Sequence, residues 1–224
     1  MIATEYINES IPTLQKDSLA AKAIDWMEEF RVSQLPVINL EESQYLGMVD
    51  ERLLYNLSIP EEVPIKDILL DYKNLYVSPN THLYSILSSF GEHQTDIIPV
   101  VDNQRKYLGT IASKDFLKEI EKIFSAQERG AIIIISLDAI QYSMTELSRL
   151  IESNNAKILS SFVERDKQYI GKLQITFKLD ITDVSFIIAT LERFGYHIKN
   201  RFDYSEGVNQ EQERLDLLLK YLEI

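Results

Sequence analysis

The chain has 224 residues, which exceeds the commonest size of a single domain and therefore indicates two compact units. Its 35 acidic and 23 basic side chains give a formal net charge of −12, which opposes binding to nucleic acid because no local basic stripe offsets it. No cysteine is present, which excludes disulfides, thiolate catalysis and sulfur-based zinc sites. The three histidines lack metal-ligand spacing, and we therefore expect no metal site.

The amino-terminal residues Met1 to Ser10 lack the basic and apolar regions of a signal peptide. No later run reaches the roughly 20 apolar residues that a membrane-spanning helix needs. We therefore expect a cytoplasmic protein with neither a nucleic-acid nor a membrane partner.

The first half of the chain contains an internal repeat. The segment QLPVIN, from Gln34 to Asn39, recurs as IIPVVD from Ile97 to Asp102, so that the two prolines are 63 residues apart. A Tyr-Leu-Gly triplet follows each segment, at Tyr45 and again at Tyr107. Apolar periodicity around these segments predicts a strand, a helix, two strands and a second helix in each copy. Because neither copy can bury its sheet alone, we expect the two to pack face to face.

The helices of the repeat are predicted from apolar residues at helical spacing. Asp17 and Ser18 can cap the first helix, whose apolar positions are Leu19, Ala23, Met27 and Phe30. Asn80 and Thr81 precede the matching helix, with the stripe Leu83, Ile86, Leu87 and Phe90. The stripe of the last helix of the second copy is Phe116, Leu117, Ile120 and Ile123.

The order helix, h-P-V-h-[DN], h-h-G-x-h and helix, in which h is apolar, resembles the CBS domain, named for cystathionine β-synthase. We assign one copy to residues 1–62 and the other to residues 63–125. The resemblance implies a compact pair that binds adenine nucleotides or adenosyl compounds in clefts between its sheets, and that senses rather than catalyses. It therefore implies AMP, ADP, ATP or S-adenosylmethionine as a regulatory ligand, with no required cofactor and no catalytic residue.

The family's ribose-binding signature is G-h-h-[TS]-x-x-D, and the second copy reads GTIASKD from Gly109 to Asp115. The aspartate is retained, the hydroxyl position is an alanine, and a serine follows it. The resemblance implies a ligand beside these residues and beside the proline strand, with the candidate site Asp115, Ser113, Ala112, Lys114, Ile97, Ile98 and Pro99. An alternative is that Asp115 is a solvated acid in the first helical turn and that the proline only fixes its strand.

The first copy departs further from the signature. It reads GMVDERL, so that Asp50 replaces the hydroxyl and Leu53 replaces the acid. An acid beside a phosphate is repulsive at close range, and we expect this cleft to be lost for nucleotides.

The second half of the chain predicts the order β-α-β-β-α-β. Residues Ala131 to Ile135 indicate a strand buried on both faces, and Ser143 to Glu146 fit a capping box before a helix. Residues Lys172 to Leu179 alternate strictly, with Leu173, Ile175, Phe177 and Leu179 on one face. A helix from about Asp183, ended by a left-handed Gly195, and a strand from His197 to Phe202 complete a ferredoxin-like sandwich.

Behind a CBS pair, this unit at residues 129–204 resembles an ACT domain, whose relatives bind amino acids between paired copies. The loop from Asp138 to Met144 lacks the Pro and Gly of the family's D-x-P-G-x-L motif, which favours a structural, dimer-forming role over an amino-acid ligand. The tail at residues 205–224 predicts an amphipathic helix that packs on its own chain or its dimer mate, with the stripe Leu215, Leu218, Leu219 and Leu222.

The whole order resembles acetoin-utilisation AcuB-type proteins. It favours a non-catalytic regulator that senses an adenine nucleotide or adenosyl ligand and acts as a homodimer. The alternative is a ligand-free scaffold whose clefts have decayed. Acidic pairs such as Glu28 and Glu29 are expected at the surface, and they do not form an acid-base site.

Overall fold

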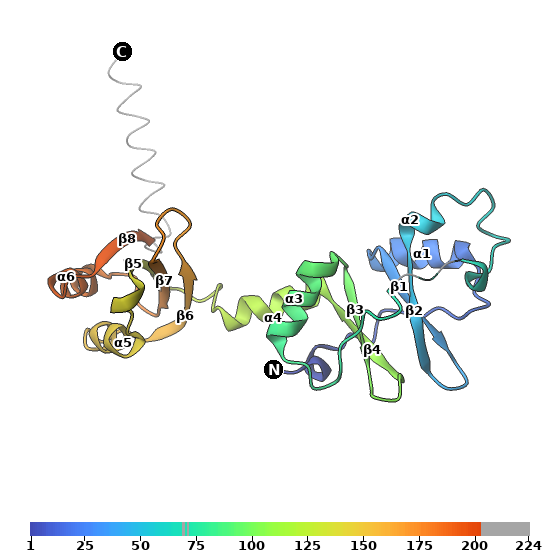
Figure 1. Cartoon of the computed structure of the whole chain (residues 1–224), viewed down its shortest axis with the longest axis horizontal. Helices are drawn as coiled ribbons and strands as arrows, with labels where there is room; N and C mark the ends of the chain where they lie inside the picture. The colour runs from blue at the N-terminus through green and yellow to red at the C-terminus, as the bar shows by residue number, and fades with distance from the viewer. Residues whose placement is uncertain (69, 71, 203–224) are drawn as a thin grey trace, which may run out of the picture. The chain divides into compact units, whose positions relative to one another are not determined.

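The computed structural model describes residues 1–202, apart from residues 69 and 71. The chain divides into two compact units, Met1–Glu119 and Ile120–Ile224 (Figure 1). None of the helices within the described ranges is both long and apolar enough to cross a membrane. The amphipathic helix predicted at residues 205–224 lies outside the described residues.

The first unit contains both repeat copies, each with an antiparallel hairpin of two strands. The first copy consists of α1 (Ala20–Phe30), β1 (Gln34–Asn39), β2 (Gln44–Asp50) and α2 (Glu51–Leu54). The second copy consists of α3 (Leu83–His93), β3 (Ile97–Val101), β4 (Tyr107–Ala112) and α4 (Ser113–Ile123). Each copy also has a single-turn helix before its first α-helix, η1 (Ala3–Tyr6) before α1 and η2 (Ile65–Asp67) before α3.

Three local predictions for the repeat were wrong. The opening strand of each copy is reduced to an isolated parallel bridge, Leu14 with Val37 and Val77 with Val100. The helix α2 has only four residues, because Asn56, Ser58 and Pro60 in the following segment do not favour continuation of the helix. The predicted caps are displaced, since the N-cap residues are Leu19 for α1 and His82 for α3.

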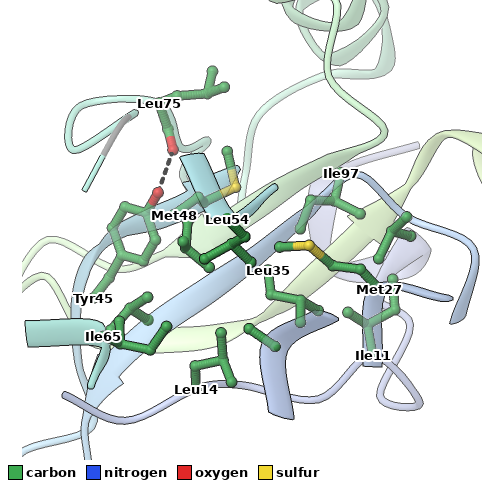
Figure 2. Close-up of a cluster of buried hydrophobic side chains, with 14 of the residues drawn as sticks. Ile11, Leu14, Met27, Leu35, Tyr45, Met48, Leu54, Ile65, Leu75 and Ile97 are labelled. Carbon is green, nitrogen blue, oxygen red and sulfur yellow. Dashed lines mark hydrogen bonds between the residues drawn. The ribbon is translucent and has the colours of Figure 1, made fainter. Parts of the chain in front are cut away.

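The two copies share one hydrophobic core, as the sequence predicts (Figure 2). Leu35 and Met48 of the first copy pack in the same cluster as Ile97 of the second. The hydroxyl of Tyr45 donates to the carbonyl oxygen of Leu75 at 3.1 Å, which satisfies the polar end of a side chain that is otherwise enclosed. Some residues of the predicted stripes lie on the surface instead: Leu19, Leu87 and Leu117 are 43%, 47% and 65% exposed.

The hairpin turns of the two copies also join through the backbone. The amide of Tyr45 donates to the carbonyl of Arg105 at 2.9 Å, and the amide of Tyr107 donates to Ser43 at 2.8 Å. Gln44 and Lys106 form an antiparallel bridge between them. Burial and backbone pairing therefore hold the two copies together as one unit.

The second unit has the predicted element order. It consists of β5 (Ile132–Asp138), the short helix η3 (Ala139–Gln141), α5 (Met144–Glu152), β6 (Ile158–Arg165), β7 (Lys172–Leu179), α6 (Ser185–Arg193) and β8 (His197–Phe202). Its strands form one antiparallel sheet in the order β6-β7-β5-β8. The side chains of α5 and α6 pack with one face of this sheet to form the core.

The other face of this sheet differs from the prediction. In β5, Ile133 and Ile135 are buried in the core, whereas Ile132 and Ile134 are only half-buried, so the expectation of burial on both faces was wrong. Both helices lie on one side, and this leaves the alternate residues less covered. On β7, Thr176 and Lys178 of the predicted polar face are 9% and 8% exposed.

Candidate functional site

The candidate site lies where β4 meets α4. Ala112 ends the strand, Ser113 begins the helix, and Asp115 lies in the first helical turn. The amide of Ser113 donates to the carbonyl oxygen of Asp96 at 2.8 Å, which fixes the junction. A cavity of about 160 Å³ opens there, and we call it the second cleft; its lining is Asn8, Ser10, Ile11, Phe30, Arg31, Val32, Asp96, Ala112, Ser113, Lys114, Asp115 and Lys118.

The amino-terminal segment of the first repeat copy, which precedes α1, completes the second cleft. The amide of Asn8 donates to the carbonyl of Thr110 at 2.8 Å, so this segment pairs with β4. Beside it, the side chain of Ile7 lies where a Cβ atom on Gly109 would be, and Gly109 has φ +151°. Glycine at this signature position therefore lets the segment approach the strand closely.

Both carboxylate oxygens of Asp115 are already occupied. The side-chain amide of Asn8 donates to Oδ2 at 2.5 Å, and Lys118 Nζ donates to Oδ1 at 3.0 Å. These two hydrogen bonds, with Lys118 contributing most, hold the pKa of the Asp115 carboxyl below its usual value, although burial acts in the opposite direction. Asp115 is thus an ionised, partnered acid, and a ligand must displace or share one of its two donors.

The charges around Asp115 differ between its two sides. The second cleft carries three cationic side chains, Arg31, Lys114 and Lys118, against two carboxylates. Another hollow of about 310 Å³, which Asp115 also lines, is acidic, with Glu5, Glu9 and Glu119. An anionic ligand is therefore favoured only on the side of the second cleft.

Four of the seven predicted site residues line the second cleft, and three do not. Ala112, Ser113, Lys114 and Asp115 line it. Ile97, Ile98 and Pro99 are buried within β3 and are not among its lining residues. The carbonyl of Pro99 accepts from the amide of Val77 at 2.9 Å, so this carbonyl is paired with the segment that precedes α3.

Asp50 of the first copy is not an unpaired acid facing a cleft. Its side chain is 1% exposed. Its carboxylate accepts from Arg52 Nε at 2.7 Å and from Gln34 Nε2 at 3.0 Å. Burial raises the pKa of the Asp50 carboxyl, but the hydrogen bonds from Arg52 and Gln34 outweigh it and hold the pKa below its usual value. The expectation that Asp50 acts only by repelling a phosphate was therefore wrong, because Arg52 compensates its charge.

Several cleft residues were missed because they come from distant parts of the sequence. Asn8 contacts Asp115 across 107 positions, and no motif marks it. Arg31 and Val32 follow α1 in the other repeat copy. The contact of Lys118 with Asp115 could have been predicted from the sequence, because residues three positions apart are neighbours on a helix surface.

Residues 61–122 match the family model of the CBS domain. This match covers the second repeat copy with Asp115, and it confirms the resemblance for that copy. An inosine-5′-monophosphate dehydrogenase of Bacillus subtilis is 30% identical over 131 residues, or 57% of this chain and 27% of that protein. The corresponding enzyme of Methanocaldococcus jannaschii is 19% identical over 191 residues, or 84% of this chain and 38% of that protein. The chain thus spans well under half the length of both relatives.

Solved structures of CBS proteins are also similar to this chain. A CBS domain pair/ACT domain protein from Thermotoga maritima has a TM-score of 0.49 and 19% identity, with 54% of this chain and 96% of that chain covered. An acetoin utilization protein (AcuB) from Vibrio cholerae has a TM-score of 0.48 and 20% identity, with 57% and 95% covered. CBSX2 in complex with AMP has a TM-score of 0.47 and 20% identity, with 55% and 97% covered.

Proposed function

Because residues 61–122 form a CBS domain, we propose that this chain is a non-catalytic regulatory protein whose second cleft binds an adenine nucleotide or adenosyl compound. The observation that carries this proposal is the ionised Asp115 beside the cationic side chains of Lys114 and Lys118. A carboxylate accepts two hydrogen bonds from a ribose diol, and ammonium groups bind phosphate. AMP, ADP, ATP and S-adenosylmethionine are the ligands in question.

The proposed pose follows from the geometry of the junction. The ribose hydroxyls approach Asp115, and the phosphate lies toward the amino terminus of α4, where backbone amides and the helix dipole favour an anion. The cavity of about 160 Å³ is smaller than the 300 Å³ or so of typical ligand pockets. A ribose that displaces Asn8 from Asp115 would couple ligand binding to the amino-terminal segment.

For the second unit we propose an ACT-like role in dimer formation. Its β-α-β-β-α-β order and single-faced core support this role, and the edge strand β6 can be extended by another copy. We further propose that the homodimer is cytoplasmic. Light scattering at micromolar concentration should give the mass of a dimer, and a monomer mass would exclude this part of the proposal.

A ligand-free scaffold is the second candidate function. It is favoured by one observation, that Asn8 and Lys118 already satisfy both oxygens of Asp115. In that case the contact only fastens the amino-terminal segment to α4. The two functions differ in whether any adenine compound binds.

Calorimetric titration of the four adenine compounds tests the proposal. Asp115→Ala should weaken binding by about ten- to a hundredfold, because it removes hydrogen bonds to a charged group. Asp25→Ala is a matched control, since Asp25 is an exposed carboxylate on α1 outside the cleft lining. Equal affinity in wild type and Asp115→Ala, or no heat with any of the compounds, would favour the scaffold.

A further inference from the structure

The first unit contains a larger cavity that shares no lining residue with the second cleft. Its volume is about 560 Å³, and we call it the lysine pocket; its lining is Lys16, Val37, Ile65, Lys66, Asp67, Ile68, Leu70 and Lys73. We propose that the lysine pocket binds a small organic anion that carries a polyphosphate chain. It is a separate site, independent of the nucleotide proposed for the second cleft.

The lining of the lysine pocket is cationic in a strongly acidic chain. Among the described lining residues three lysines accompany one carboxylate, Asp67, although the whole chain has a net charge of −12. Lys66 is paired with Asp17 at 3.0 Å, and both groups are largely exposed. Neither Lys16 nor Lys73 has an ion pair with any residue in the described ranges. The ammonium groups of Lys16 and Lys73 thus have no carboxylate partner among the described residues, and together they attract an anion to this hollow.

The backbone around the three lysines is fixed by hydrogen bonds. The amide of Lys66 donates to the carbonyl of Lys16 at 2.8 Å, which holds these residues side by side. The carbonyl of Lys73 accepts from Arg105 Nη2 at 2.9 Å, and its neighbour Tyr72 accepts from the Tyr45 hydroxyl at 3.0 Å. The lysine side chains therefore project from anchored positions, which lowers the entropy cost of collecting them around a ligand.

The size and floor of the lysine pocket indicate the class of ligand. Of the apolar lining residues, Val37 and Ile65 are fully buried, and the half-buried Ile68 and Leu70 supply an accessible apolar floor. An inorganic ion would leave this floor unused, whereas the organic part of a metabolite covers it. Lysine binds phosphate as a point charge, and several lysines suit a chain of phosphates better than a single one. Nucleoside triphosphates and similar organic polyphosphates have this chemistry.

Titration of inorganic tripolyphosphate and ATP into the full chain tests the proposal. Lys16→Gln/Lys73→Gln should weaken tripolyphosphate binding by about tenfold or more, because it removes two charged donors. Both side chains are exposed, so the fold should be retained. Binding should also weaken with added salt, and less steeply in the double variant.

Two variants separate the lysine pocket from general charge and from the second cleft. Lys157→Gln/Lys167→Gln removes the same charge from exposed lysines of the other unit and should leave tripolyphosphate affinity within about twofold of wild type. Asp115→Ala should also leave it unchanged, because tripolyphosphate has no ribose. Three outcomes would each overturn the proposal for the lysine pocket. They are no binding of tripolyphosphate at low salt, equal weakening of its binding by the two double lysine substitutions, and loss of its binding in Asp115→Ala. None of these outcomes depends on whether an adenine compound needs Asp115.

Discussion

The backbone amide of Ser33 donates a hydrogen bond to Asp96 Oδ2 at 2.9 Å. These two residues are 63 positions apart, the same spacing as the repeated prolines, so equivalent positions of the two copies bind each other. The contact continues through Gln34, which accepts from the amide of Asp96 at 3.1 Å and donates to Asp50 at 3.0 Å. A chain of polar contacts thus links the lining of the second cleft to a buried acid of the first copy.

We expect Asp96→Ala to lower the free energy of unfolding by about 1–3 kcal/mol, because it leaves the partly buried amide of Ser33 without its acceptor. Asp96→Asn keeps an acceptor oxygen and should therefore lower the free energy of unfolding by less than Asp96→Ala does. Urea unfolding of both variants measures the difference, with the exposed Asp25→Ala as control. Equal free energies of unfolding in all three variants would show that the hydrogen bond between Ser33 and Asp96 does not stabilise the fold.

Asp50 should make the stability of the chain depend on acid pH. Its pKa is lowered in the folded state, so its contribution is fully present above the unfolded value near 4 and is lost as the pH falls through the folded pKa. Asp50→Asn should therefore lower the free energy of unfolding by about 1–3 kcal/mol at pH 7. The difference in this free energy between the variant and wild type should become smaller below about pH 4. Glu28→Gln, which neutralises an exposed acid of α1, should show no such difference.

If an adenine nucleotide binds the second cleft as proposed, Asn8→Ala should strengthen its binding. The change frees Asp115 Oδ2 from its donor, which the ribose must otherwise displace. A gain of about fivefold in ATP affinity corresponds to about 1 kcal/mol for one displaced hydrogen bond. Calorimetry on Asn8→Ala beside Asp115→Ala should give opposite effects. Weaker binding in both variants would mean that Asn8 contacts the ligand itself.

Two buried threonines should respond oppositely to the same substitution. Thr95 Oγ1 is buried without a hydrogen-bond partner among the described residues, whereas Thr110 Oγ1 lies 2.7 Å from the Tyr107 hydroxyl. Thr95→Val should therefore raise the free energy of unfolding by about 1 kcal/mol, and Thr110→Val should lower it by a similar amount. The first copy already has valine, Val32, at the position equivalent to Thr95. Destabilisation by Thr95→Val would point to a polar partner for its hydroxyl.

Much of the fold could be predicted because local pattern and tertiary packing agree. Apolar and polar residue types alternate along β7, and its apolar residues Ile175, Phe177 and Leu179 are buried in the core as predicted. Ser143 caps α5 by accepting from the amide of Glu146 at 3.3 Å, as its motif predicts. Gly195 has the expected left-handed conformation, with φ +84°. For this reason periodicity predicted the element order of the second unit, and the helices and hairpin strands of the first.

The remaining features depend on contacts between distant segments. The opening strand of each copy was overpredicted because its apolar residues are buried by packing, with only a single bridge such as Leu14 to Val37. The candidate site was predicted only along the signature, and Asn8 and Arg31 enter it through pairings that no single motif contains. The sequence also cannot show that Asp50 is neutralised, because that follows from burial beside Arg52 and Gln34.

The outer strand β8 has a consequence for how the chain behaves at high concentration. Along it, His197, Lys199 and Arg201 alternate with other residues at one end of the four-stranded sheet. A foreign strand that docks against this edge meets Arg201 and also Lys199, which is ion-paired with Asp166 at 3.4 Å. Charged side chains along an edge strand are a common protection against open-ended stacking of sheets. Replacing Lys199 and Arg201 with threonine should therefore shorten the lag before turbidity develops on gentle heating, even where the melting temperature is unchanged.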